Sequence, residues 1–458
     1  MAISAPPPGI FKAYDIRGIY GEELDAETAH LIGRAYARVL ARIRGKETAE
    51  LHVGLGHDMR LSSPEMADGV RRGLVEEGVA VLDAGQIATE LSYYLVGSRE
   101  LDGGAMVTAS HNPKKYTGVK LLREGALALS GDAGIQEVRA QIEAGLPDPP
   151  GGGSVQEVDI YPDFHEHMLS LIDPGMIGPL RILADGSDGM AGPMVGPLLE
   201  QLDLDVTPSR WVPDGNFPEA GPNPFLEENR RMLVEHVKKS GFDLAIAWDG
   251  DADRCFFIDD TGSFADGDFV CALLARAALA KKPGSTILYD PRSSRAVADT
   301  VAAAGGKSDL SRVGHAFFKI RMRETGAVFG GEVSGHYYFR DFYCADSGTM
   351  PALLMLELVS REGRPLSDLM DEFRSKYFIS GEINSEVADQ QAKMEEIADR
   401  YSDGEITRLD GVSIDYSDWH FNVRPSNTEP LLRLNLESLV SREDMEAKRD
   451  EVLALIRG

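Results

Sequence analysis

The sequence has few of the features that mark secreted or membrane-spanning proteins. Only three of its 458 residues are cysteines, and Cys255, Cys271 and Cys344 are too widely spaced to suggest a metal pair or a disulfide framework. The longest apolar run, residues 269–280, contains Arg276 and is too short to cross a bilayer. The N-terminal residues lack the basic start and apolar core of a signal peptide. We therefore expect a cytoplasmic protein.

Positive charge is also scarce. The chain has 47 lysines and arginines against 74 aspartates and glutamates, which gives a net charge of −27. So acidic a surface repels nucleic acid and anionic membranes, and we expect neither as a partner. It also repels phosphorylated small molecules. A phosphorylated ligand would therefore require arginines and lysines in the loops that bind it.

The pattern of apolar residues indicates a multidomain α/β protein. The length is far beyond one hydrophobic core, and 43% hydrophobic and 26% charged residues are typical of globular chains. Strand, polar loop, helix and returning strand follow one another three times. The first strands cover residues 50–55, 180–184 and 286–289. This alternation is typical of right-handed crossovers in mixed, mostly parallel sheets, so the sequence predicts three tandem, similar α/β domains.

Local signals refine these elements. We expect Ser63 to be the N-cap of the first crossover helix, with Pro64 in its first turn. The later crossover helices are expected at about 193–201 and 295–304. Near the C-terminus, Ser441 precedes an expected helix over 442–456, and Asp444 makes a variant of the capping box.

Domain boundaries follow from changes in composition. Residues 145–154 are too rich in proline and glycine for regular structure, a softer boundary lies near 260, and a third lies near 368–380. Beyond the third boundary, strands and helices follow a different order, which predicts a smaller α+β domain. The predicted domains are 1–148, 149–260, 261–370 and 371–458.

Each α/β pattern is followed by a further apolar strand that stops in a polar loop. Residues 104–107 lead into Thr108-Ala-Ser-His-Asn-Pro113, which is expected to present Ser110 on an exposed turn. The corresponding loops later in the chain begin at Asp249 and Gly330. Ligands of such sheets bind at the carboxyl ends of the strands, so these loops are the expected site. The alternative is that Ser110 only forms hydrogen bonds with nearby backbone groups, as serines in turns often do.

Asp249-Gly-Asp-Ala-Asp-Arg254 is the strongest local signal. Three carboxylates this close repel one another unless a cation lies between them, and oxygen ligands favour Mg²⁺ or Ca²⁺. An EF-hand is rejected, because Arg254 occupies the position of its glycine and Asp260 that of its last glutamate. A solvated acidic turn remains the alternative. If Ser110 were phosphorylated, a phosphate oxygen could complete the coordination of the metal.

Four motifs together resemble the α-D-phosphohexomutase family, in particular its bacterial phosphomannomutase/phosphoglucomutase members. They are the Ser110 loop, the Asp249 loop, Gly331-Glu-Val-Ser-Gly-His336 and Arg424-Pro-Ser-Asn-Thr-Glu-Pro430. Ala13-Tyr-Asp-Ile-Arg-Gly18 matches the N-terminal signature of the family. The resemblance covers all four predicted domains.

The resemblance implies a role for each matching residue. Ser110 would carry the phosphoryl group, with the other catalytic residues being His111, Lys120 and Arg254. Mg²⁺ would be bound by phosphorylated Ser110, Asp249, Asp251 and Asp253. The residues implied to bind substrate are Tyr14, Arg17, Arg292, His315, Glu332, Ser334 and His336. The distal phosphate would be bound by Arg424, Ser426, Asn427 and Thr428.

The implied reaction interconverts hexose 1-phosphate and hexose 6-phosphate of glucose, mannose or both. Phosphorylated Ser110 would give its phosphoryl group to the sugar, and hexose 1,6-bisphosphate would be both intermediate and activator. The partner would be a small phosphosugar, and the protein a monomer or weak dimer. The requirement set by the acidic surface is met, because basic residues lie in or beside the motif loops: Arg17, Lys120, Arg254, Arg292 and Arg424.

Some positions depart from the family pattern, and other functions stay open. Val333 argues against a phosphoglucosamine mutase, which is the nearest alternative within the family. Pro425 replaces a residue that is often small, and Arg292 stands where some relatives have lysine. A serine phosphatase would need no phosphate-gripping fourth domain. A non-catalytic sugar-phosphate sensor would be expected to have lost Ser110 or one of the aspartates.

Overall fold

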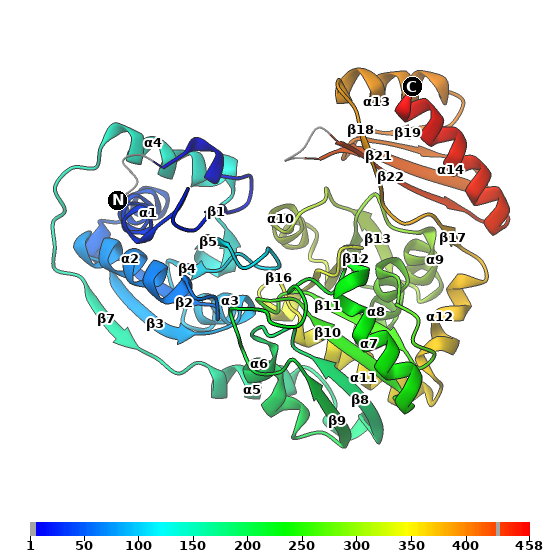
Figure 1. Cartoon of the computed structure of the whole chain (residues 1–458), viewed down its shortest axis with the longest axis horizontal. Coiled ribbons are helices and arrows are strands. Elements are labelled where there is room, and N and C mark those ends of the chain that lie inside the picture. The colour runs from blue at the N-terminus through cyan, green and yellow to red at the C-terminus, as the bar shows by residue number, and fades with distance from the viewer. Residues whose placement is uncertain (1–5, 427–430) are drawn as a thin grey trace. The chain divides into compact units, whose positions relative to one another are not determined.

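The computed structural model describes residues 6–426 and 431–458 and divides the chain into two compact units. The first unit comprises Met1–Phe264 and His336–Gly363, and the second comprises Ala265–Gly335 and Arg364–Gly458. Figure 1 shows the elements of both units along the chain. Each unit is described separately below.

The first unit begins with a mixed sheet of strand order β1-β5-β4-β2-β3-β7. Strands β4, β2, β3 and β7 are parallel, whereas β1 and β5 run antiparallel to their neighbours. The strands are β1 (Ile16–Ile19), β2 (His52–His57), β3 (Ala80–Gln86), β4 (Gly103–Val107), β5 (Tyr116–Arg123) and β7 (Ser154–Glu157), and β6 (Leu127–Ala128) pairs with β5.

Helices α1 (Ala26–Arg44) and α2 (Ser63–Glu76) pack closely against each other in this part of the unit. Glycine makes the approach possible, because a Cβ atom on Gly69 of α2 would lie 2.3 Å from the carbonyl oxygen of Ala26. Both helices bury apolar side chains in one core together with β2 and β4. Helices α3 (Thr89–Ser98) and α4 (Gln136–Ala144) complete this domain.

The rest of the first unit contains a four-stranded sheet of order β11-β10-β8-β9. Strands β10, β8 and β9 are parallel, and β11 is antiparallel to β10. The strands are β8 (Leu180–Asp185), β9 (Leu204–Ser209), β10 (Leu244–Trp248) and β11 (Cys255–Asp259). The other elements are α5 (Tyr161–Ser170), α6 (Ala191–Leu199), α7 (Glu227–Ser240), β15 (Tyr337–Phe339), β16 (Ala345–Asp346) and α11 (Thr349–Glu362).

The second unit contains three parallel strands of order β13-β12-β14. They are β12 (Thr286–Tyr289), β13 (Lys307–Leu310) and β14 (Phe329–Gly331). The accompanying helices are α8 (Gly267–Lys281), α9 (Arg295–Ala303), α10 (His315–Thr325) and α12 (Leu366–Arg374). Because β12 and β14 are parallel neighbours, the loops at their carboxyl ends emerge side by side.

The C-terminal part of the second unit is an antiparallel sheet covered by two helices on one face (Figure 1). Alternate residues of β21 and β22, such as Phe421, Val423, Leu432 and Leu434, form one core with α13 and α14. The elements are β17 (Phe378–Ile379), β18 (Ile383–Glu386), α13 (Gln390–Arg400), β19 (Glu405–Thr407), β20 (Val412–Asp415), β21 (Trp419–Pro425), β22 (Leu431–Ser438) and α14 (Arg442–Arg457).

The predicted fold class is confirmed, with α/β domains followed by an antiparallel α+β domain. Ser441 caps α14 as predicted, because its side chain accepts a hydrogen bond from the backbone nitrogen of Asp444. The prediction for Ser63 is wrong. Ser63 is the first residue of α2, its hydroxyl donates to Asp58, and Ser62 is the N-cap.

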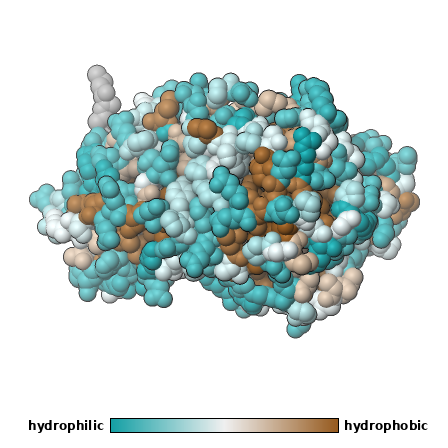
Figure 2. Space-filling view, turned by 90° about the horizontal axis from the view of Figure 1, so that it is seen from below, coloured by the Kyte–Doolittle hydropathy of each residue, from teal (hydrophilic) through white to brown (hydrophobic). Residues whose placement is uncertain are grey.

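The face seen in Figure 2 is mainly hydrophilic, as the high content of charged residues leads one to expect. Smaller hydrophobic areas lie between the hydrophilic ones. Across residues 6–426 and 431–458, no helix is long and apolar enough to cross a membrane.

Candidate functional site

Ser110 lies in the first unit, just after β4, whose five residues are all buried. Its φ angle is +50°, an unusual value for a residue other than glycine. The Thr108 hydroxyl accepts a hydrogen bond of 2.8 Å from the Ser110 backbone nitrogen. The Ser110 Oγ atom lies 3.1 Å from Nδ1 of His111 and 3.3 Å from Oδ2 of Asp249. Ser110 itself is buried, at 4% exposed, whereas residues 113–115 of the same turn are exposed, so the expected exposure holds for the turn but not for its serine.

Arg60 stabilises the Ser110 loop through hydrogen bonds to its backbone. Its guanidinium donates to the carbonyl oxygens of Ser110 at 2.6 Å and Asn112 at 2.7 Å, and also to those of Pro113 and Tyr116. Arg60 is almost completely buried and forms an ion pair with Asp58. Several donors in a rigid fork suit a loop whose carbonyls point to one side. The conformation of the Ser110 loop therefore depends on Arg60.

The three predicted metal-binding aspartates converge after β10. Each of Asp249, Asp251 and Asp253 offers a carboxylate oxygen within 4.8 Å of the others, and all three side chains are buried. Lys120 of β5 reaches into this group, donating to Oδ2 of Asp251 at 2.8 Å and Oδ2 of Asp253 at 2.6 Å. The Arg254 guanidinium pairs with Asp249 at 2.7 Å. Two cations thus offset part of the charge of three carboxylates.

The remaining oxygens test whether a metal fits here. Oδ1 of Asp251 and Oδ1 of Asp253 are buried and have no hydrogen-bond partner among the residues described. Buried carboxylate oxygens are costly to leave without a partner. A divalent cation coordinated by these oxygens would satisfy both, and a purely oxygen donor set suits Mg²⁺ or Ca²⁺. The residues present therefore fit such an ion.

Thr89, at the start of α3, positions one of the ligands. Its hydroxyl donates to Oδ2 of Asp251 at 2.6 Å, and its backbone nitrogen donates to the Asp251 carbonyl at 3.0 Å. The next residue, Glu90, is buried and accepts hydrogen bonds from Gly348 and Thr349 at the start of α11. The N-terminus of α3 therefore connects the Asp251 loop to another helix of the same unit.

Burial and neighbouring charges shift the pKa values of this cluster. Burial, together with the charges of Asp253 and Asp251, raises the pKa of Asp249 to about 7. Burial also acts to raise the pKa of Asp251, but the Lys120 ammonium and the Thr89 hydroxyl hold it below its usual range. Burial opposes the charge on Lys120, yet Asp251 and Asp253 keep its pKa above the usual range.

The surroundings of His111 disfavour a positive charge on its imidazole. Burial and the nearby cations of Arg254 and Arg17 hold its pKa well below the usual range. A neutral imidazole beside a hydroxyl can accept a hydrogen bond from it or donate one, depending on its tautomer.

Two other predicted residues of the first unit, Arg17 and His336, lie close to this cluster. Arg17 of β1 donates to Oδ1 of Asn112 at 3.0 Å and pairs with Asp15. His336 is half-buried, with Nε2 at 3.8 Å from Oδ1 of Asp253. Asp253 and His336 also form a group of possible metal ligands with Asp346. Tyr14 lies in the turn before β1.

In the second unit, the ends of β12 and β14 bring Arg292 and Glu332 together. Arg292 binds both oxygens of Asp290, at 2.9 and 2.7 Å, and lies 3.5 Å from Oε1 of Glu332. The same Glu332 oxygen accepts a hydrogen bond from the backbone of Gly314, next to His315. Burial opposes the charge on Arg292, but Asp290 and Glu332 keep its pKa above the usual range. Ser334 follows in the same loop and is half-buried.

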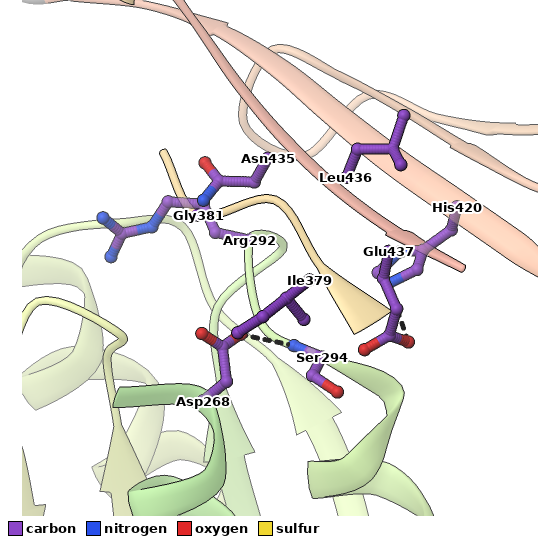
Figure 3. Close-up of a pocket in the computed structure, with 9 residues that line it drawn as sticks. All are labelled: Asp268, Arg292, Ser294, Ile379, Gly381, His420, Asn435, Leu436 and Glu437. Atoms are coloured by element: carbon purple, nitrogen blue, oxygen red, sulfur yellow. Dashed lines mark hydrogen bonds and ion pairs between the residues drawn. The ribbon is translucent and has the colours of Figure 1, made fainter. Parts of the chain in front are cut away.

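A small cavity of about 10 Å³ lies near Arg292 in the second unit. Figure 3 shows Asp268, Glu437 and His420 beside it, and the Arg292 guanidinium points away from Glu437 and His420. Asp268 and Glu437 cap the start of α9, accepting from the backbone nitrogens of Ser294 at 2.7 Å and Arg295 at 3.2 Å. Burial raises the pKa of Asp268 to about 7. The volume suits one water molecule.

The predicted phosphate-binding loop begins at the end of β21. Arg424 is 6% exposed and donates to Oε2 of Glu382 at 2.9 Å. Burial and the neighbouring cations of Arg292 and Arg433 lower the pKa of Arg424. Ser426 is buried and lies 3.4 Å from NH2 of Arg433. Asn427 and Thr428 lie outside the described residues.

Several residues at these sites were missed from the sequence. Thr89 and Glu382 carried no local signal, because each contacts the site across a long stretch of chain. Arg60 did carry one, since it ends the loop after β2, where side chains reach ligands in such sheets.

Comparisons with known proteins decide the family. Models of phosphoglucomutase/phosphomannomutase domains I, II, III and the C-terminal domain match residues 8–147, 162–262, 266–377 and 382–455. The chain belongs to the phosphoglucomutase/phosphomannomutase family. A protein of Xanthomonas campestris named "Phosphohexose mutases" is 42% identical over 455 residues, covering 98% of this chain and 99% of that protein.

Further relatives support the assignment of the chain to the phosphoglucomutase/phosphomannomutase family. A phosphomannomutase of Escherichia coli K12 is 41% identical over 456 residues, covering 97% of this chain and 98% of the relative. The crystal structure of a family member from Burkholderia thailandensis superimposes with a TM-score of 0.89 at 31% identity, covering 98% of this chain and 97% of that one. The predicted family and the predicted class of enzyme, an isomerase of the phosphohexomutase type, are confirmed.

Proposed function

We propose that this family member interconverts hexose 1-phosphates and hexose 6-phosphates of glucose, mannose or both, with Ser110 as the phosphoryl carrier. One observation carries the proposal. The Ser110 hydroxyl lies 3.3 Å from Asp249 and beside Asp251 and Asp253, whose Oδ1 atoms accept no hydrogen bond from any described residue. A hydroxyl in this position can carry a phosphate whose oxygens share a cation with the aspartates.

Asp249, Asp251 and Asp253 would hold Mg²⁺, and phosphorylated Ser110 would be the fourth ligand. When bound, the ion polarises the phosphoryl group and offsets its charge. Lys120 and Arg254 add positive charge where the phosphoryl group is transferred, since both already pair with these carboxylates. Lys120 is also assigned as the general acid/base, and the His111 nitrogen, 3.1 Å from the Ser110 oxygen, would bind that oxygen or its proton.

The second unit supplies recognition of the sugar and of the phosphate that does not react. Glu332 and Ser334 would bind neighbouring sugar hydroxyls, since a carboxylate accepts and a hydroxyl both donates and accepts. Arg424 and Ser426, with Asn427 and Thr428, would bind the distal phosphate. Tyr14, Arg17, Arg292, His315 and His336 are assigned to the same substrate.

The proposed reaction cycle requires that Ser110 be phosphorylated again before the product leaves. Phosphorylated Ser110 gives its phosphoryl group to a free hydroxyl of the hexose phosphate. The proton of that hydroxyl passes to the general base, and the bond from phosphorus to the Ser110 oxygen breaks as this oxygen takes up a proton and becomes a hydroxyl again. The resulting hexose 1,6-bisphosphate returns its other phosphoryl group to Ser110. The product therefore carries its phosphate at the other position, and the Ser110 ester is restored.

A substrate panel tests this proposal. Glucose, mannose and glucosamine 1-phosphates are incubated in parallel with Mg²⁺ and a trace of glucose 1,6-bisphosphate. The 6-phosphate and free phosphate are then measured. Formation of glucose or mannose 6-phosphate is expected. Turnover of glucosamine 1-phosphate alone would favour a phosphoglucosamine mutase, release of free phosphate a phosphatase, and no turnover at all would refute the proposal.

A further inference from the structure

Glu382 lies among three arginines of the second unit. Its Oε2 atom accepts a hydrogen bond of 2.9 Å from Arg424 and lies 3.8 Å from the guanidinium of Arg292. Its Oε1 atom accepts a hydrogen bond of 3.3 Å from Arg433. One carboxylate thus links two residues already assigned to the substrate, Arg292 and Arg424, with a third cation that has no assigned role.

Arg424 and Arg433 stand directly opposite each other. They are register partners in the antiparallel pair of β21 and β22. Like charges directly opposite in a sheet repel each other and destabilise the pairing. Glu382 precedes β18, which pairs with the other edge of β22, and it supplies a single negative charge to the two guanidinium groups. The pair therefore keeps an excess of positive charge in a chain whose net charge is −27.

Arg424 and Arg433 each also have a hydrogen-bond donor that is not used within the described residues. The Nε atoms of Arg424 and Arg433 are buried and make no hydrogen bond to any described residue. An anion with several oxygens could accept from both guanidinium groups together, whereas the two oxygens of Glu382 are already shared among three arginines. A phosphate ester offers three such oxygens and up to two negative charges.

We propose that Arg433 is a second cation of the distal-phosphate site, and that Glu382 is an internal anion that competes with the phosphate for Arg424 and Arg433. This inference rests on the proposed function, which assigns the distal phosphate to Arg424. Glu382 keeps the two opposed arginines together in the free protein and weakens their hold on the phosphate. Arg433 strengthens that hold.

Weaker binding of the distal phosphate by Arg424 and Arg433 suits the proposed reaction. Each phosphate of the bisphosphate must occupy the distal site in turn, so each must also be released from it. Binding that is equally strong throughout lowers the KM without raising the kcat. A competing carboxylate therefore favours turnover at the expense of affinity.

A purely structural role for this ion-pair network is the competing explanation. If Glu382 only stabilised the sheet, its loss and the loss of Arg433 would act in the same direction and loosen the site. If Glu382 competes with phosphate, the two losses act in opposite directions. The signs of the two effects thus separate the explanations.

The experiment compares Glu382→Gln and Arg433→Gln with wild type by calorimetric titration with glucose 6-phosphate and mannose 6-phosphate. Glu382→Gln is expected to bind about three- to tenfold more tightly, and Arg433→Gln about tenfold or more weakly, as for charged hydrogen bonds. Glu395 and Arg408 form an exposed pair in the same domain and provide matched controls. Glu395→Gln and Arg408→Gln are expected to change affinity less than about twofold.

Further measurements keep each result decisive. If Arg433→Gln does not fold, as judged by circular dichroism, Arg433→Lys retains the charge without the fork and is expected to show intermediate affinity. Weaker or unchanged binding by Glu382→Gln would overturn the inference, as would unchanged binding by both Arg433 variants. Wild type that binds hexose 6-phosphate no better than free hexose would instead refute the proposed function. These failures are distinguishable because binding is measured without turnover.

Discussion

Replacement of Arg60 by methionine is expected to destabilise the first unit and to disorder the loop that carries Ser110. The guanidinium donates to four carbonyl oxygens, those of Ser110, Asn112, Pro113 and Tyr116, and it pairs with buried Asp58. Removing one partner of a buried ion pair costs about 3–5 kcal/mol. Carbonyls left without a donor would add about 1–3 kcal/mol each unless water reached them.

The expected loss is therefore at least about 3 kcal/mol in the free energy of unfolding of the first unit, measured by urea denaturation. Arg60→Lys should lose less stability, since it keeps the charge, but it cannot reach four carbonyls with the geometry of the guanidinium. Arg71, which pairs with Asp68 and Asp83 at the surface of the same domain, provides a control, and Arg71→Met should cost less than about 1 kcal/mol. A loss below about 1 kcal/mol in Arg60→Met would refute this reasoning.

Three further outcomes are expected. Thr89→Val should weaken Mg²⁺ binding about 10- to 100-fold, because Thr89 orients Asp251. Mg²⁺ titration of the thermal melting temperature measures this, and Thr48→Val, at a half-buried position outside the aspartate cluster, should show no change. Removal of divalent ions with EDTA should abolish turnover, and Mg²⁺ should restore it; full activity in EDTA would contradict the metal assignment. For Asp268, the pKa is about 7 in the folded state against 3.8 when unperturbed, so its contribution to stability is present below pH 3.8 and is lost as the pH rises to about 7. Each pH unit in this window corresponds to about 1.4 kcal/mol, so Asp268→Asn should gain stability relative to wild type between pH 5 and pH 7, and a pH-independent difference between their denaturation curves would count against the assignment.

The part of the site that could be predicted from sequence is the part set by strand ends. Apolar strands that stop in polar loops predicted the positions of Asp249, Arg292 and Glu332. The contact between Arg292 and Glu332 follows because β12 and β14 are parallel neighbours. Three aspartates in one tight loop could hardly lie far apart, and they do converge.

Contacts that depend on packing or register could not be predicted in this way. Thr89 reaches Asp251 from another domain, and nothing near Thr89 in the sequence indicates this. The opposition of Arg424 and Arg433 requires the register of two strands, and the place of Glu382 requires that of a third. Ser63 was expected to cap α2, but the hydroxyl of a residue inside the first turn finds Asp58 instead.

The roles of the site residues remain predictions, and Ser110 is the residue on which the others depend. The most direct measurement is the mutase activity of Ser110→Ala beside that of wild type, with the mass of the Ser110 peptide determined after incubation with glucose 1,6-bisphosphate and Mg²⁺. We expect wild type to gain one phosphoryl group on this peptide, and Ser110→Ala to gain none and to lose at least about a thousandfold in kcat. Full activity of Ser110→Ala, or phosphorylation of wild type at another residue, would contradict the proposed mechanism.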